Sequence, residues 1–561
     1  MNQMSKNCSK CNTPFEFTDE DRAFLEKVSP KCDGKTLAIG EPENCPDCRM
    51  QQKMNFRNER HLYRRTSSLS GNGMISIYHE SSPHRVYHPD EWWGNKWEGT
   101  DYEKDFDFSR PFFDQFKELL LAVPRIGLFN VNPTNSEFCQ QAYNNKNCYL
   151  CTVITECEDC MYISHANKNT DCFDCDYVQN CQLCFGCLDS DKLYNCSDCQ
   201  SCQNSSDLVF CYDCIGCDNC FGCFGLRKKQ FQIFNTQYSK EDYFKQLEEL
   251  GKGKFSKFDL YRKKFQEALI DAPQRESWSL NTVDCVGNYL INAKNCQMCF
   301  DSFEIQDCKN CTWIFESHDI HDVYGLGKSD WLYNCLGNEN AHTGAFNTFV
   351  SDSNDVYYSD CCFYSSNLFG CAGLRNKKFH ILNKKYTPDE YDQMIPRIVE
   401  HMKKHGEWGK FPPADLAPFG YDESVAHENF PLTKDKAEKD GFVWAGHAEQ
   451  RPSATKIVPA KDIPDSIADV TDEILDWAIE CKTSTKLFKI QEKELKFYRT
   501  AKLPIPRQHP DQRYRNRMDK RNPRKMYERS CTECKAKILT TFDSTRPEKV
   551  FCEKCYLGKL Y

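Results

Sequence analysis

Eight cysteines near the ends of this 561-residue chain form four Cys-x2-Cys pairs. They are Cys8, Cys11, Cys45, Cys48, Cys531, Cys534, Cys552 and Cys555. Two thiolates at this spacing can hold one side of a tetrahedral zinc ion, and a second pair completes the coordination. The gap between the last two pairs (535–551) has the length usual for zinc ribbons, whereas the N-terminal gap (12–44) is longer and contains a competing candidate ligand, Cys32. Because four thiolates leave no position for water, we expect about two structural Zn²⁺ ions per chain.

A third group of cysteines follows a different rule. From Cys139 to Cys223 there are 18 cysteines, and each lies a multiple of three residues from every other. Where this position is not Cys, it is mostly Ile, Val, Leu, Ala or Ser, which are core residues rather than metal ligands. We therefore interpret these cysteines as core. A metal- or redox-active thiol array is the alternative, and disulfides would be expected if the protein were secreted.

The same pattern recurs 148 residues later without a gap. Cys148, Cys151, Cys160, Cys187, Cys214 and Cys223 superpose on Cys296, Cys299, Cys308, Cys335, Cys362 and Cys371. The segment "FGCFGLRKKQFQIFNTQY" (221–238) becomes "FGCAGLRNKKFHILNKKY" (369–386). Cysteine is rarer in the second copy, but the position stays small or apolar. A metal cluster would not survive the loss of its ligands, so this comparison favours the core interpretation.

A period of three fits neither a helix nor an ordinary strand. It is typical of a narrow β-solenoid in which one side chain per triplet points inward and the chain bends between triplets. We favour solenoid turns of four triplets each. The residue before the inward position is often Asn, Asp or Gly, which tolerate a positive φ. These predicted corner residues are Asn147, Asp159, Asp171, Asp174, Asn180, Gly186, Asn195, Asp198, Asp213, Gly216, Asn219 and Gly222, then Asn295, Asp307, Asn310, Gly325, Asn334, Asn340 and Gly370.

These observations predict a mainly β, multidomain protein with two tandem duplicated β-solenoids and small zinc-ribbon or treble-clef modules at both ends. Amphipathic stretches at 116–125 and 265–274 are expected to cap the solenoids that they precede. Trp92, Trp93 and Trp97 are expected to attach the N-terminal module to the first solenoid. The predicted parts are a treble-clef-like zinc module (1–66), an aromatic-rich connector (67–115), a first solenoid with caps (116–250), a second (251–405), a Pro-rich surface segment and linker (406–470), an altered zinc module with a basic run (471–529) and a zinc ribbon (530–561).

The altered module is recognised by aligning Cys481 with Cys8. The four ligand positions then hold Cys481, Ser484, His509 and Gln512. Serine and glutamine are poor zinc ligands. We predict that this copy keeps the fold and has lost its metal, and a weak Cys/His site is the alternative.

Positive charge is concentrated at one end of the chain. The net charge is −9, but residues 481–561 contain 22 Lys and Arg against 9 Asp and Glu. Basic residues beside zinc modules suit phosphate contacts, and docking of the tail on the acidic solenoids is the alternative. The candidate nucleic-acid-binding residues are Arg57, Arg60, Arg64, Arg65, Arg513, Arg515, Arg517, Lys520, Arg521, Arg524 and Lys525.

At the N-terminal knuckles, "CSKCNTPFEFT…ENCPDCR" resembles the probable treble-clef zinc-ribbon family. The resemblance covers residues 5–60, and an altered version covers 478–515. It implies zinc on Cys8, Cys11, Cys45 and Cys48, while Ser484, His509 and Gln512 depart from the family pattern. The whole arrangement, including "FGCFGLRKKQF" and "LYRR", is also similar to a group of large cysteine-rich proteins of candidate-phylum bacteria, which implies no particular activity.

The sequence contains no run of about 18 apolar residues and no apolar signal segment, so we expect a cytoplasmic protein without a membrane span. It also lacks a metalloprotease, phosphate-loop or nucleophile-elbow motif. The hypothesis is a non-enzymatic zinc-binding scaffold or adaptor for a macromolecular partner such as RNA or a ribonucleoprotein, with no small-molecule cofactor besides zinc. The alternatives are a metal- or redox-active thiol array and a β-solenoid enzyme acting on polysaccharide.

Overall fold

The computed structural model describes residues 4–251, 253–448 and 451–560. The chain forms two compact units, each built from segments that are far apart in the sequence. Unit 1 comprises residues 1–128, 277–446 and 524–526, and unit 2 comprises residues 129–276, 447–523 and 527–561. Each unit contains one long sheet, and the fold is mainly β.

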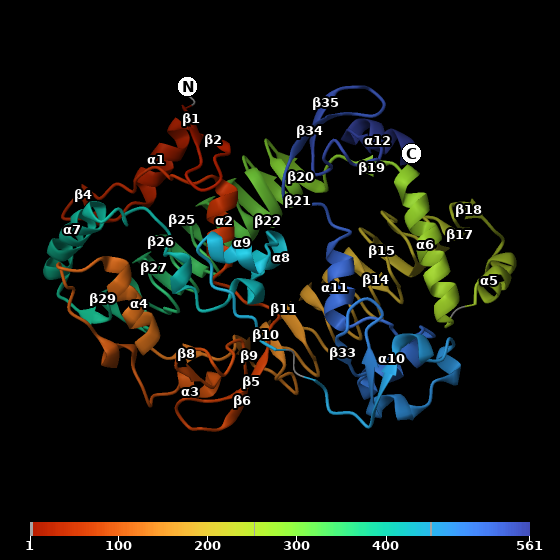
Figure 1. The fold of residues 1–561 in the computed structure, drawn as a ribbon. Helices are drawn as coiled ribbons and strands as arrows, with labels where there is room; N and C mark the ends of the chain where they lie inside the picture. Colours follow the sequence, from red (N-terminus) through yellow and green to blue (C-terminus); the bar gives the residue numbers. More distant parts are fainter. Residues whose placement is uncertain (1–3, 252, 449–450, 561) are drawn as a thin grey trace. The chain divides into compact units, whose positions relative to one another are not determined.

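The sheet of unit 2, here called the first ladder, is formed by strands that pair in chain order from β9 to β18 (Figure 1). Pairing is parallel, and most residues lie opposite the residue 12 positions later, as Cys139 lies opposite Cys151. Only β18 runs antiparallel to its neighbour. The strands are β9 (Asn130–Val131), β10 (Cys139–Tyr143), β11 (Cys151–Thr155), β12 (Ser164–Asn167), β13 (Asp176–Gln179), β14 (Leu188–Tyr194), β15 (Gln203–Val209), β16 (Asp218–Phe221), β17 (Gln230–Ile233) and β18 (Thr236–Gln237).

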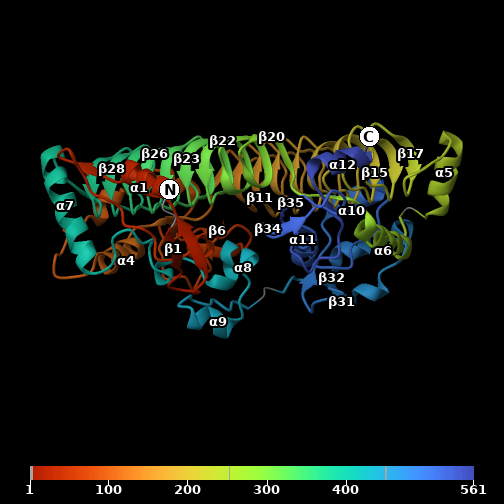
Figure 2. The same cartoon turned by 90° about the horizontal axis from the view of Figure 1, so that it is seen from above.

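The sheet of unit 1, the second ladder, repeats this plan, with its strands following one another in a row (Figure 2). Phe303 lies opposite Phe315, again 12 positions later. The first pair is shorter, because Ser279 lies opposite Leu290 and the register shifts between Val286 and Gly287. The strands are β20 (Ser279–Val283), β21 (Val286–Lys294), β22 (Gln297–Lys309), β23 (Thr312–His321), β24 (Tyr324–Gly327), β25 (Asp330–Tyr333), β26 (Glu339–Ala345), β27 (Ser351–Tyr357), β28 (Ser366–Phe369), β29 (Lys378–Ile381) and β30 (Lys384–Lys385).

Both ladders bend at intervals of three residues. Asn147, Asp159 and Asp171 have φ values of 54°, 57° and 51°, in the left-handed region that Asn, Asp and Gly tolerate best. Every corner residue predicted from the sequence has a positive φ, which confirms that part of the prediction. The same conformation also occurs at residues that do not favour it, such as Val153 and Tyr162.

Away from the ends of the ladders the residue after each corner is buried, and these residues form the cores of the ladders. Throughout the described residues every cysteine is a free thiol, and those of the first ladder are 0–3% exposed. The thiol of Cys148 donates to the carbonyl of Cys157, nine residues on, at 3.4 Å. Inward asparagines donate in the same direction, as Asn145 does to the carbonyl of Ile154 at 3.2 Å, and Asn145 also accepts from the N–H of Cys157 at 2.8 Å. Inward serines such as Ser190 donate instead to the carbonyl two residues earlier. The core interpretation of these cysteines is therefore confirmed as far as their burial is concerned.

Four small modules accompany the ladders, and each contains a β-hairpin followed by one or two helices. Modules 1 and 2 belong to unit 1, and modules 3 and 4 belong to unit 2. Module 1 contains β1 (Met4–Asn7), β2 (Pro14–Phe17), α1 (Asp19–Val28), β3 (Lys31–Cys32), β4 (Lys35–Thr36) and α2 (Pro46–Met54); module 2 contains β5 (Tyr63–Thr66), β6 (Gly73–Ser76), β7 (Val86–Tyr87) and α3 (Pro89–Trp93). Module 3 contains β32 (Trp477–Glu480), β33 (Leu487–Phe488), α10 (Glu492–Ala501) and α11 (Pro510–Met518); module 4 contains β34 (Tyr527–Ser530), β35 (Lys537–Thr540), β36 (Val550–Phe551) and α12 (Glu553–Leu560).

The remaining elements cover or connect these parts. They are β8 (Arg125–Ile126), α4 (Phe112–Ala122), α7 (Pro388–Lys404), α8 (Val425–Asn429) and α9 (Lys434–Lys439) in unit 1, and α5 (Lys240–Glu249), α6 (Phe255–Asp271), β19 (Gln274–Arg275) and β31 (Lys456–Pro459) in unit 2, with short 3-10 helices between them. Among the described residues, no helix has the length and hydrophobicity that crossing a membrane requires.

Two predictions about the flanking segments are wrong. Helix α4 precedes the first ladder in sequence, but its Phe112 packs on Phe369 of the second ladder, 5.6 Å between ring centroids. Helix α6 precedes the second ladder, but its Phe258 packs on Phe210 of the first, at 4.8 Å. Each ladder is therefore covered by the helix that precedes the other one.

The tryptophan cluster also packs on a different ladder from the one predicted. Trp92 is fully buried and lies 5.6 Å from Phe363 of the second ladder. The guanidinium of Arg375 donates to the carbonyl oxygens of Trp92 and Trp97 at 2.6 and 2.9 Å. The cluster thus attaches module 2 to the second ladder, because Phe363 of that ladder packs on its rings and Arg375 donates to its carbonyl oxygens.

Candidate metal centres

Module 1 brings Cys8, Cys11, Cys45 and Cys48 together. The first two lie at the turn between β1 and β2, Cys45 is the N-cap of α2, and Cys48 is in its first turn. The four sulfur atoms lie within 4.8 Å of one another, and the Sγ atoms of Cys11 and Cys45 are 3.7 Å apart. Zinc–sulfur bonds of about 2.3 Å place tetrahedral sulfurs about 3.8 Å apart, so the cluster has the size that zinc requires.

Module 4 forms a second cluster of the same design. Cys531 and Cys534 lie at the turn between β34 and β35, while Cys552 precedes α12 and Cys555 lies in its first turn. These sulfurs also lie within 4.8 Å of one another, and the Sγ atoms of Cys534 and Cys552 are 3.7 Å apart. The two clusters could each hold one metal ion, with all four ligands supplied by the protein.

Hydrogen bonds favour the thiolate form, which is the form that binds metals, at one sulfur of each cluster, while hydrogen bonding to a neighbouring sulfur raises the pKa values of the partner thiols Cys48 and Cys555. A hydrogen bond from the Cys48 thiol lowers the pKa of Cys45 to about 5. Burial raises the pKa of Cys531, but bonds from the backbone N–H groups of Cys552 and Cys534 outweigh burial and lower it to about 6.

Module 3 repeats the first hairpin and the two helices of module 1. Cys481 follows β32, and His509 is the N-cap of α11, which begins with Pro510 just as α2 begins with Pro46. The N–H of His509 donates to the Sγ of Cys481 at 3.3 Å, and the N–H of Cys552 donates to Cys531 in the same way. The side chain of Gln512 donates to Asn516 instead of facing a metal.

Module 2 is a counterpart of module 4 that sequence reasoning missed. One shift along the sequence places β5 on β34, β6 on β35 and β7 on β36, since it takes Tyr63 to Tyr527 and Val86 to Val550. Even the partner strands match, because β7 pairs in parallel with β8 and β36 pairs in parallel with β19. The sequence relation that could have identified module 2 is this same shift, which aligns four residues with the four cysteines of module 4: Ser67, Ser70, His88 and Glu91 with Cys531, Cys534, Cys552 and Cys555.

The four side chains at these positions also lie together. The hydroxyl of Ser67 donates to the carboxylate of Glu91, and His88 is the N-cap of α3. Burial raises the pKa of Glu91, but hydrogen bonds from Ser67 and Ser70 outweigh it and lower the pKa. A hydrogen-bonded polar cluster therefore stands where module 4 has four thiols.

Each unit thus has a cluster of four cysteines in one of its two modules and other side chains at the corresponding positions of its other module. Unit 1 keeps it in module 1 and lacks it in module 2, whereas unit 2 lacks it in module 3 and keeps it in module 4. Within the described part of the chain, four-cysteine clusters of metal-binding size occur only in modules 1 and 4.

Modules 1 and 3 dock on their ladders through equivalent residues. Phe24 of α1 stacks on His321 with ring centroids 3.7 Å apart, and Phe497 of α10 stacks on Phe173 at 4.1 Å. His321 and Phe173 are 148 residues apart, which is the repeat distance of the ladders. The duplication therefore includes the placement of a module on a ladder within each unit.

Buried ion pairs repeat this correspondence. Arg49 of α2 lies 2.7 Å from Asp322, and Arg513 of α11 lies 2.6 Å from Asp174, again 148 residues before Asp322. All four side chains are at most 9% exposed, so each charge depends on its partner. In modules 1 and 3, therefore, the docking arginine lies on the helix that begins at the second pair of ligand positions.

The predicted nucleic-acid-binding residues divide into two groups. Most of them contact carboxylates or backbone of their own unit. Arg517 pairs with Asp176 at 2.5 Å, Arg521 with Asp189 at 3.0 Å, Lys520 with Asp198 at 4.0 Å, Arg524 with Asp301 at 2.8 Å, Arg57 with Glu59 at 2.6 Å, Arg60 with Glu428 at 4.0 Å, and Arg65 donates to the His79 carbonyl at 3.2 Å. Arg64, Arg515 and Lys525 are exposed. The docking alternative therefore describes most of the basic run, and nucleic-acid binding stays a prediction.

Comparisons with known proteins do not add to this description. No protein family model and no curated protein matches the chain.

Proposed function

We propose that this chain is a non-enzymatic scaffold of two tandem β-solenoids, each clamped by a pair of modules of which one binds a structural Zn²⁺ ion. The parallel register of 12 positions, the corners at every third residue and the buried third-position side chains support the solenoids. A ligand pair at a hairpin turn with another at a helix start supports treble-clef-like zinc modules. Free thiols throughout suit a reducing, cytoplasmic environment.

This proposal rests on module 1, where the four-cysteine cluster is directly connected to the residue that docks the module on the ladder. Cys45 and Cys48 fix the first turn of α2, and Arg49, the next residue, reaches the buried carboxylate of Asp322. A metal bound by four thiolates supplies only structural energy, because it offers no open coordination position. Zinc at this place would therefore hold the helix that attaches the module to the solenoid.

Metal analysis of anaerobically purified protein tests the proposal. We expect about two zinc ions per chain, and about one in each of the variants Cys48→Ser and Cys555→Ser. Cys187→Ser, in the core of the first ladder, is the matched control and should keep about two. Iron, copper or a larger zinc content would instead support a thiol array in the ladders, and a zinc-free protein would refute the clamp.

Hydrogen exchange after chelation locates the effect of the metal. Removal of zinc should increase exchange in residues 4–56 and 527–560, since structural zinc contributes about 10–16 kcal/mol in small modules. Exchange in the strands of both ladders should change little. An equal increase of hydrogen exchange in the ladder strands would indicate that the core thiols bind metal.

A macromolecular partner remains part of the proposal, and RNA is the one to test first. The exposed Arg515 supports a phosphate contact, although the buried pairs of Arg513 and Arg517 do not. We expect a fluorescent single-stranded RNA to bind at about 50 mM salt, to dissociate at about 200 mM and to bind more weakly to Arg515→Glu. If no RNA binds at low salt, RNA is excluded as the partner, and the proposal of structural zinc is unaffected.

A further inference from the structure

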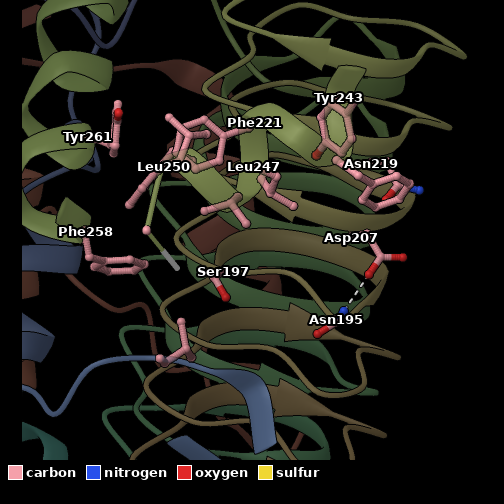
Figure 3. Close-up of a pocket in the computed structure, with 15 residues that line it drawn as sticks. Asn195, Ser197, Asp207, Asn219, Phe221, Tyr243, Leu247, Leu250, Phe258 and Tyr261 are labelled. Carbon is pink, nitrogen blue, oxygen red and sulfur yellow. Dashed lines mark hydrogen bonds between the residues drawn. The ribbon is translucent and has the colours of Figure 1, made fainter. Parts of the chain in front are cut away.

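Unit 2 contains an apolar pocket between the first ladder and helices α5 and α6. Its volume is about 170 Å³, somewhat larger than an engineered cavity of ~150 Å³ that binds benzene. Figure 3 shows Phe221, Phe258 and Tyr261 among the rings that line it, with Leu247 and Leu250 beside them. Asn195, Asp207 and Asn219 supply polar atoms to the same pocket.

The corresponding place in unit 1 is filled by an aromatic side chain of the chain itself. Phe210 and Phe221 of the pocket correspond to Tyr358 and Phe369, 148 residues later. Trp408 packs on both of these rings, with centroids 5.9 Å from Tyr358 and 6.4 Å from Phe369, the latter stacked at 13°. Its indole N–H donates to the carbonyl oxygen of Ala38 at 2.8 Å.

Two further features near this place differ between unit 1 and unit 2. Helix α7 runs to Lys404 and buries Ile398 and Met402, whereas its counterpart α5 ends at Glu249. The β3 strand of module 1 packs against α7, and Cys32 lies beside Asp392. In module 3 the stretch from Cys481 to His509 is shorter than the stretch from Cys8 to Cys45 in module 1, and no counterpart of β3 lies within it.

We infer that the pocket of unit 2 receives an aromatic side chain, of tryptophan type, from a partner polypeptide. The ring pair that contacts Trp408 in unit 1 is present in unit 2, where Phe258 packs on Phe210 and a pocket remains beside it. Helix α5 is shorter than its counterpart α7, and the described part of module 3 has no counterpart of β3. Phe244 at the pocket is 42% exposed, which leaves an apolar rim for the surrounding peptide. This inference rests on the proposed scaffold function only in taking the partner to be a polypeptide.

Saturation-transfer NMR with two probes tests the pocket. The probes are indole and a peptide of residues 405–411, HGEWGKF, which carries Trp408 in its own sequence context. We expect both to bind the full chain in the millimolar range. Leu247→Trp, which fills the pocket, should weaken binding at least tenfold, whereas Leu260→Trp, on an exposed leucine of α6 outside the pocket, should leave it unchanged.

Val209→Phe provides a second, smaller filling of the pocket if Leu247→Trp does not fold. Loss of binding in either folded variant supports the inference. Absence of binding to the wild-type chain, or equal binding to the filled variants, overturns it. Neither result affects the zinc content, so failure of the pocket and failure of the zinc clamp are distinguished.

Discussion

Units 1 and 2 have the same plan, but they differ in which module holds four cysteines. In unit 1 the four cysteines lie in module 1, which carries the docking residue Arg49. In unit 2 they lie in module 4, which follows the docking helix α11 in the sequence. In unit 2 the docking helix α11 is held instead by two buried ion pairs, Arg513 with Asp174 and Arg517 with Asp176. The comparison teaches that a module docks through the same packing and buried charge pair whether or not it contains four cysteines.

The ladders differ as well, because the first is richer in cysteine. It contains 18 cysteines from Cys139 to Cys223, while the second contains nine from Cys285 to Cys371. Positions that hold Cys172, Cys175 and Cys184 in the first ladder hold Ile320, Val323 and Leu332 in the second. The same backbone therefore accepts either thiols or aliphatic groups in its core.

Alkaline pH should destabilise both ladders. Burial raises the pKa of Cys335 and of Cys371 in the second ladder from 9.0 to about 12, so above pH 9 the folded state holds protons that the unfolded state releases. Stability is then lost as pH rises from 9 to 12, by about 1.4 kcal/mol per pH unit for each such thiol. In the first ladder, burial likewise raises the pKa of Cys172 and Cys175 well above 9.0. We expect pulse alkylation with mass spectrometry to label the core thiols of both ladders only as the protein unfolds above pH 9, and labelling of a ladder that remains folded would contradict this expectation.

Restoring four cysteines in module 2 should create a third metal site. The variant combines Ser67→Cys, Ser70→Cys, His88→Cys and Glu91→Cys, and we expect about three zinc ions per chain instead of about two. A structural zinc site contributes about 10–16 kcal/mol in small modules, so the third ion should resist mild chelation. A matched variant with alanine at the same four positions controls for the loss of the Ser67–Glu91 hydrogen bond. An unchanged zinc content would show that module 2 is no counterpart of module 4.

Breaking a docking ion pair should loosen one unit and spare the other. Removal of one partner leaves a buried charge unpaired, which costs about 3–5 kcal/mol. We expect Asp174→Ala to expose residues 477–518 to limited proteolysis, and Asp322→Ala to expose residues 4–56. Each variant serves as the control for the other, and cleavage of the same module in both would refute the correspondence.

Exchanging core residues between the ladders should have the smallest effect. Cys175→Val copies Val323, and a swap of similar volume costs less than about 1.5 kcal/mol. We expect thermal unfolding close to that of the wild type and an unchanged metal content. Loss of metal in this variant would revive the thiol-array alternative.

Much of this plan could be predicted from the sequence, because it depends on local rules. The Asn, Asp and Gly corners, the core position after them and the two four-cysteine sites are all visible as spacing. The left-handed conformation of Val153 and Tyr162 could not be predicted, since their residue types oppose it and only the neighbouring turns impose it.

The pairing of modules with ladders could not be predicted either. Arg49 and Asp322 are 273 residues apart, and no local propensity connects them. Module 2 was missed because Ser67, Ser70, His88 and Glu91 do not form the Cys-x2-Cys pairs by which the other sites were recognised. Its spacing alone could have identified it.

The assignment of segments to units has a consequence for biosynthesis. The first ladder, residues 130–237, leaves the ribosome before the second, yet its own modules lie at residues 477–560. Unit 1 has all of its main parts once residue 446 is made, so we expect it to fold first. The earlier ladder must wait, with Asp174 and Asp176 uncovered, until Arg513 and Arg517 are synthesised near the end of the chain. The two ladders are thus translated in the reverse of the order in which their units can be completed.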